Sequence, residues 1–159
     1  MFTLDDMVTF AWAFFITLPA TFLIHITGHV FFAKLFGART ELIIGKGKKL
    51  LKLGKIEIRQ FYFTDAACIY DKIRKERRWK HALIYAGGSL FNILSIIIVN
   101  GMILADIWPK HLFFYQFVYF SIYYVFFALL PIDYGENHPS DGKAIFSVLK
   151  YGKTYKKFD

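Results

Sequence analysis

Cysteine and early basic residues are what this sequence most clearly lacks. Cys68 is its single cysteine, which excludes an intrachain disulfide and a zinc site built from several cysteines, and predicts an ordinary thiol. No lysine or arginine precedes Lys34. A secretory signal peptide begins with a basic segment, and its apolar segment is shorter than the one found here. We therefore expect the first apolar stretch to be retained as a membrane span.

Apolar and aromatic residues are what the sequence has in excess. Hydrophobic residues make up 56% of the 159 residues and aromatic residues 20%, and the mean hydropathy is +0.39. They are gathered in long runs, which indicates an integral membrane protein of one domain. A helix of about 20 residues crosses the hydrocarbon layer, and three spans are predicted at about 7–36, 79–105 and 111–131. Pro19 should kink the first span because it lacks a backbone donor.

The segments outside the spans have other patterns. Residues 39–63 contain several glycines and end in alternating apolar and polar residues, so they predict a small antiparallel sheet. The charged stretch 70–80 predicts a solvated juxtamembrane helix, and 141–159 predicts a C-terminal helix and a lysine-rich tail. The predicted fold class is an all-α polytopic membrane protein: three transmembrane helices, with a small antiparallel β-sheet between the first and second spans.

The basic residues are distributed unevenly along the chain. The net charge is +8, and thirteen of the 20 lysines and arginines lie between Arg39 and Lys80. The positive-inside rule then predicts an outside N-terminus, a cytoplasmic sheet and a cytoplasmic C-terminus, in what we take to be a bacterial cell membrane. A basic block beside membrane spans favours anionic lipid as its partner over nucleic acid.

Two histidines lie four residues apart inside the first span. Side chains at i and i+4 share one helical face, so His25 and His29 can bind one metal ion. Gly28 between them would allow a second helix to approach closely. The alternative is that the imidazoles form hydrogen bonds between helices. Asp141, at a loop-to-helix transition, is the best third ligand, although the local sequence alone favours a helix N-cap at that place. Two histidines and a carboxylate favour zinc among the divalent ions.

Three sequence motifs occur in an order typical of one family. Residues 25–29 read HITGH and are followed by AKLFG at 33–37; residues 87–92 read GGSLFN; residues 129–132 read LLPI, and Asp141-Gly142 follows. This set resembles the site-2 protease family of intramembrane zinc metalloproteases, whose motifs are His-Glu-x-Gly-His, Ala-Gly-Pro-x-x-Asn, and Leu-Pro followed by Asp-Gly. The resemblance covers most of the chain.

The resemblance implies roles for individual residues. His25, His29 and Asp141 would hold one zinc ion, and Asn92 would hold the substrate or a developing oxyanion beside it. The sheet would offer an edge to which an extended peptide could be added. The site would open to the cytoplasm.

The chain departs from the family at the position that matters most for catalysis. Ile26 stands where the family has the glutamate that acts as general base, and losing such a group typically costs about 10²- to 10⁴-fold in rate. Glu136 or His138 could supply a substitute base. Ser89 replaces the family's proline.

These features predict an impaired protease that binds a membrane-embedded peptide or partner protein without efficient cleavage. Two alternatives remain open at the level of sequence. One is an active zinc metalloprotease with a substitute base, and the other is a membrane scaffold or immunity-type protein whose histidines bind no metal. The oligomeric state is open as well.

Overall fold

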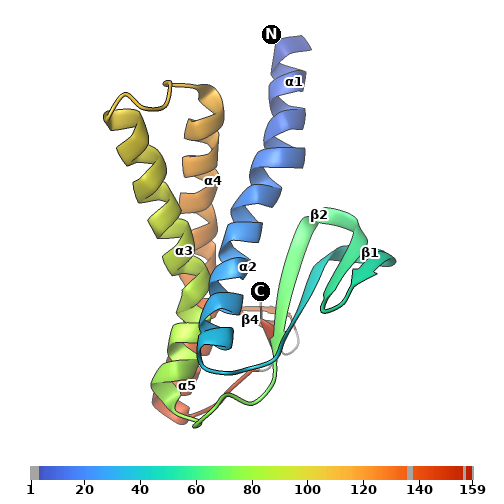
Figure 1. Cartoon of the computed structure of the whole chain (residues 1–159), viewed down its shortest axis with the longest axis vertical. Helices are drawn as coiled ribbons and strands as arrows, with labels where there is room; N and C mark the ends of the chain where they lie inside the picture. The colour runs from blue at the N-terminus through green and yellow to red at the C-terminus, as the bar shows by residue number, and fades with distance from the viewer. Residues whose placement is uncertain (1–3, 136–137, 156, 159) are drawn as a thin grey trace.

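The computed structural model describes residues 4–135, 138–155 and 157–158. Its long helices stand side by side, and a twisted hairpin lies against one of them (Figure 1). The helices are α1 Leu4–Trp12, the π-helix η1 Ala13–Thr17, α2 Leu18–Leu35, α3 Arg78–Leu104, α4 Leu112–Leu129 and α5 Asp141–Tyr151.

Three helical segments are long and apolar enough to cross a membrane. They are Asp6–Leu35, Arg78–Leu104 and Leu112–Leu129, and their ends lie within two residues of those of the three predicted spans. The first span is continuous but irregular, because η1 inserts a π-helical turn just before Pro19. Proline cannot donate to the carbonyl of the preceding turn, and a π-helical turn is one recognised form of such an irregularity.

The prediction of an all-α fold is wrong, because the hairpin is far longer than the predicted strands. β1 (Thr40–Leu53) and β2 (Ile56–Tyr70) have 14 and 15 residues, and Gly54, with φ +59°, lies in the turn between them. The residues from Leu42 to Ile44 each pair twice with β2, once within Ala66–Cys68 and once within Ile56–Ile58. The hairpin thus folds back on itself, and its pairing extends well past residue 63.

The helix predicted over 70–80 is also wrong. The chain from Asp71 to Arg77 is irregular, and α3 begins at Arg78. Backbone hydrogen bonds from distant residues hold this connection, since Asp71 N donates to Arg39 O at 3.0 Å and Arg74 N to Phe36 O at 2.9 Å. These bonds compete with the local ones that a helix needs.

The main apolar core lies where α2, α3, α5 and the hairpin meet. α2 and α3 approach each other at the backbone level, since a Cβ at Gly28 would lie 2.1 Å from Gly87 O. Cys68 is completely buried there, and burial raises the pKa of its thiol to about 12. The thiol is therefore protonated and shielded. The buried apolar members are Phe22, Ile26, Ala33, Ala38, Ala66, Cys68, Tyr70, Ile73, Ile84, Tyr85, Ala144 and Val148.

The C-terminal part is a helix followed by a short strand. A two-stranded sheet, β3 (Asp133–Gly135) with β4 (His138–Pro139), connects α4 to α5. α5 ends at Gly152, which has φ +72°. The chain then turns back so that β5 (Lys157–Phe158) pairs with β2, which gives the sheet order β1-β2-β5.

Candidate metal centre

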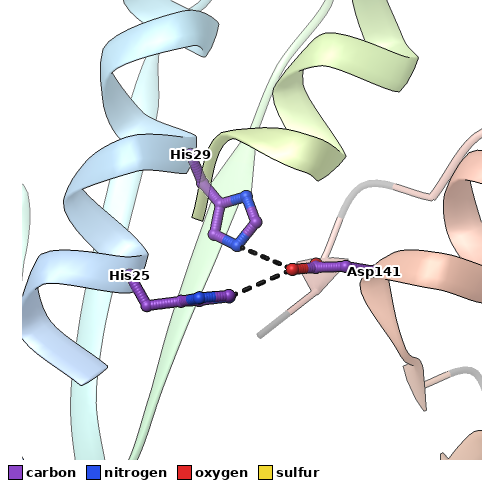
Figure 2. Close-up of side chains that lie close together, drawn as sticks. All are labelled: His25, His29 and Asp141. Carbon is purple, nitrogen blue, oxygen red and sulfur yellow. Dashed lines mark ion pairs between the residues drawn. The ribbon is translucent and has the colours of Figure 1, made fainter. Parts of the chain in front are cut away.

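His25 and His29 lie one above the other on the inner face of α2. Their exposed fractions are 1% and 0%, and their ring centroids are 4.7 Å apart. Asp141 reaches toward both from the N-terminus of α5 (Figure 2). Its Oδ2 is 3.0 Å from His25 Nε2 and 3.4 Å from His29 Nε2. The three candidate ligand atoms all lie within 4.8 Å of one another.

Asp141 is not the N-cap of its helix. Ser140 caps α5, and its Oγ accepts a hydrogen bond from Lys143 N at 3.1 Å. Ser140 also donates to Leu130 O, which ties the start of α5 to the end of α4. The neighbouring serine therefore takes the capping role, and the Asp141 carboxylate points at the histidines.

Gly142 allows α5 to begin at this place. A Cβ at Gly142 would lie 2.0 Å from Leu129 O, a backbone atom that cannot move aside cheaply. The close approach of α5 to the end of α4 brings Asp141 to the level of the histidines, although 112 positions separate it from His29.

The hydrogen bond on the far side of His29 determines its tautomer. His29 Nδ1 lies 2.7 Å from Ile84 O, and a carbonyl can only accept, so Nδ1 carries a proton. In the neutral ring, Nε2 then bears a lone pair that faces the Asp141 carboxylate. Two buried acceptors this close need a proton between them, carried by the ring or by the carboxyl group, or a metal ion. Such a carbonyl contact is the usual outer support of a metal-binding histidine.

Asn92 supports the other histidine. It is completely buried, and its amide nitrogen lies 3.5 Å from His25 Nδ1. Amide nitrogen and oxygen are interchangeable by a flip. The flipped form would place the carbonyl oxygen where it can accept from Nδ1–H, the tautomer that leaves Nε2 available to a metal.

Gly88 on α3 keeps the space in front of the two imidazoles clear. A Cβ there would lie 2.4 Å from His25 Nε2 and 2.5 Å from His29 Nε2. Any other residue would therefore collide with both candidate ligands. This role of Gly88 was not predicted from the sequence, although paired glycines inside an apolar span are a signal of close helix contact.

A cavity of about 310 Å³ adjoins the site, and its wall includes the aromatic side chains of Tyr123, Tyr124, Phe127 and Tyr134. The Tyr124 ring lies 4.7 Å from the His25 ring. Burial acts to raise the pKa of Asp141, but His29 and His25 outweigh it and hold that pKa below its usual value. The cavity is lined by His25, Lys46, Thr64, Tyr123, Tyr124, Phe127, Ala128, Tyr134, Pro139, Ser140 and Asp141.

Neither Ile26, which stands at the position of the general base, nor His138 lines the cavity. Ile26 is 1% exposed and packs in the main apolar core, and the described residues that line the cavity do not include it. His138 is half-buried in β4 and is likewise not among them. Glu136 lies outside the described residues.

Comparisons with known proteins place the chain in a family. No model of a protein family matches it, and no solved structure matches it. It is 50% identical over 155 residues to a protein of Bacillus subtilis (strain 168) described as "Uncharacterized membrane protein YwmF", and the match covers 98% of each chain. With its three apolar helices and near-complete coverage of that relative, the chain belongs to the same family of membrane proteins as YwmF.

Proposed function

We propose that this membrane protein binds one divalent metal ion, zinc by preference, through His25, His29 and Asp141. The convergence of three buried ligand atoms from α2 and α5 carries the proposal. The two facing acceptors, His29 Nε2 and Asp141 Oδ2, support it because a metal ion between them would satisfy both, as a shared proton would. Three protein ligands and one open position are typical of zinc sites that act on a substrate.

We further propose a site-2-protease-like scaffold that is impaired as a protease. A bound divalent ion would polarise a carbonyl group in the cavity. Proton transfer would still need a general base, and Ile26 cannot provide one. The chain's own residues are therefore suited to holding a peptide beside the ion rather than to cleaving it efficiently.

The cavity supports a membrane-embedded peptide or partner protein as the ligand. Its volume of about 310 Å³ suits a few side chains, and its aromatic wall suits apolar ones. Thr64 of β2 forms part of the wall, so an extended segment lying along the sheet would reach the site.

A second proposed partner is anionic lipid on the cytoplasmic face of a bacterial cell membrane. Trp79 is half exposed, and Lys80 Nζ lies 5.8 Å from the centroid of its ring, a pairing typical of membrane interfaces. This proposal includes the orientation in which the sheet and the C-terminus are cytoplasmic. Exposed basic residues gather between the sheet and α3: Lys72, Arg74, Lys75, Arg77 and Arg78.

Metal content of the purified protein tests the first proposal. After growth with added zinc, we expect about one ion per chain by elemental mass spectrometry in the wild type. His25→Ala and His29→Ala should lose it, whereas His111→Ala, an exposed histidine at the start of α4, should retain it. The metal-free scaffold would be supported instead if the wild type contained no metal and if His25→Ala and His29→Ala both folded as the wild type does.

Incubation with single-span membrane peptides tests the second proposal. We expect no efficient cleavage by the wild type. Cleavage that appears only in Ile26→Glu would show that the scaffold is intact and that the wild type lacks only the base. Ile26→Gln is the matched control, because glutamine is polar and has the size of glutamate but cannot act as a base. Efficient wild-type cleavage that disappears in Glu136→Gln would establish the active protease with a substitute base.

A further inference from the structure

The C-terminal tail does not leave the molecule after α5. Gly152 reverses the chain, and Tyr155 then meets the hydroxyl of Tyr85 on α3. That hydroxyl accepts from Tyr155 N at 2.8 Å and lies 3.0 Å from Tyr155 O, to which it donates. One side chain thus satisfies both backbone groups of a tail residue, as a neighbouring strand would. Tyr155 also packs against the main apolar core.

The tail ends as a strand on the second edge of β2. β1 pairs with one edge over the stretch 66–70 of β2. On the other edge, Phe158 pairs with Cys68 and Lys157 with Ile69. An unpaired strand edge readily accepts another strand, and here the chain's own terminus takes this place.

This edge leads to the candidate metal centre. Thr64, four residues before Cys68 on the same strand, lines the cavity beside His25 and Asp141. Pro139 of β4 lines it too, and β4 contacts β5. β5 therefore adjoins β2 and β4, the two strands that each contribute a residue to the wall of the cavity.

We propose that the edge of β2 from Thr64 to Ile69 binds an extended polypeptide segment, and that β5 is its resident occupant, which a partner must displace. Among the described residues, two strand pairs and the two hydrogen bonds of the Tyr85 hydroxyl hold the tail, and each such bond contributes little net stability. The occupant has the sequence KTYKKF at 153–158. A partner that displaces the tail is accordingly an extended segment with a large aromatic residue, which would occupy the position that Tyr155 now takes.

This inference rests on the proposed function only in taking the partner to be a peptide. Docking of the tail involves none of the three proposed metal ligands, so the tail proposal and the metal proposal can fail separately. In His29→Ala, which should lack metal, the tail should still protect the edge of β2 from hydrogen exchange. Metal content measured on the same samples tells the two proposals apart.

Hydrogen exchange of the β2 amides at 64–70, followed by mass spectrometry on the full chain, tests the inference. We expect slow exchange in the wild type and at least about tenfold faster exchange at residues 64–69 in Tyr85→Phe, which removes the anchoring hydroxyl together with its 3.0 Å contact to the Tyr70 hydroxyl. Tyr155→Ala should act in the same way while leaving the Tyr85 hydroxyl in place. Tyr115→Phe, an exposed tyrosine on α4, is the matched control and should change nothing.

A synthetic peptide with the sequence of residues 153–159 provides the binding arm. It should bind Tyr155→Ala at least about tenfold more tightly than the wild type, and a scrambled peptide should bind neither. Equal binding to both proteins would overturn the proposal. So would unchanged β2 exchange in both tail variants, or protection that depends on protein concentration, because the strand would then come from a second copy.

Discussion

The two ends of the helix bundle are built differently. In the site half, formed by α2, α5 and α3 from Arg78 to Asn92, polar ligands and glycine backbones are buried together. In the outer half, formed by α1, α4 and the rest of α3, large apolar side chains point outward, as Ile97 at 62% and Leu104 at 83% exposure do. The site half thus depends on fitted internal contacts, whereas the outer half needs apolar surface for lipid.

The largest effect on stability is expected from alanine substitution at two glycines, one in each half of the bundle. A Cβ at Gly28 would lie 2.1 Å from the backbone oxygen of Gly87, but one at Gly101 in the outer half would meet no atom within 4 Å among the described residues. Gly28→Ala should lower the free energy of unfolding by about 3 kcal/mol through overpacking. Gly101→Ala should raise it by about 0.5 kcal/mol because alanine favours the helix. Unfolding in mixed detergent, followed by circular dichroism, measures both; equal effects would remove the contrast between the halves.

The next prediction concerns metal affinity at constant fold. In Gly88→Ala the new methyl group would come within 2.5 Å of both imidazole nitrogens. We expect zinc affinity to fall by about 100-fold or more, which competition with a zinc-binding dye would detect. Gly101→Ala again serves as the control. Undiminished affinity in a folded Gly88→Ala protein would show that the ion is not bound at this site.

A smaller effect is expected at two asparagines eight residues apart on α3. The Asn92 amide contacts His25, whereas Asn100 donates to Ile96 O at 3.0 Å within its own helix. Asn92→Ala should weaken zinc binding by about 10-fold, and Asn100→Ala should leave it unchanged. The same dye competition applies. A similar loss in both variants would indicate a general effect on the bundle rather than support of His25.

The smallest effect is expected at the boundary of the two halves, in two buried threonines one turn apart. Thr21 Oγ1 donates to Thr17 O at 3.1 Å, while Thr17 Oγ1 is buried with no hydrogen-bond partner among the described residues. Thr17→Val should therefore be neutral or stabilising by up to about 1 kcal/mol. Thr21→Val should cost about 1 kcal/mol. Thermal unfolding of the two variants measures both changes. A Thr17→Val protein less stable than the Thr21→Val protein would contradict this prediction.

Local patterns predicted much of this molecule. Hydropathy located the three spans, because a membrane helix is recognised by length and composition alone. Helical periodicity placed His25 and His29 on one face. The segment 70–80 was misjudged because its charges are compatible with a helix, while the hydrogen bonds that prevent one come from Arg39 and Phe36. The strand pairing beyond residue 63 was missed because its partners lie more than twenty residues away.

The sequence by itself determined a membrane protein with a histidine pair on one helical face and no glutamate between them, since these properties depend on neighbours within a few residues. Only the tertiary structure decided that Ser140 rather than Asp141 caps α5, that the freed carboxylate meets both imidazoles, and that Ile26 packs in the apolar core. It alone showed the tail on the edge of β2. Each of these depends on contacts between segments far apart in the chain, which glycine backbones at Gly28, Gly88 and Gly142 allow and which no local pattern encodes.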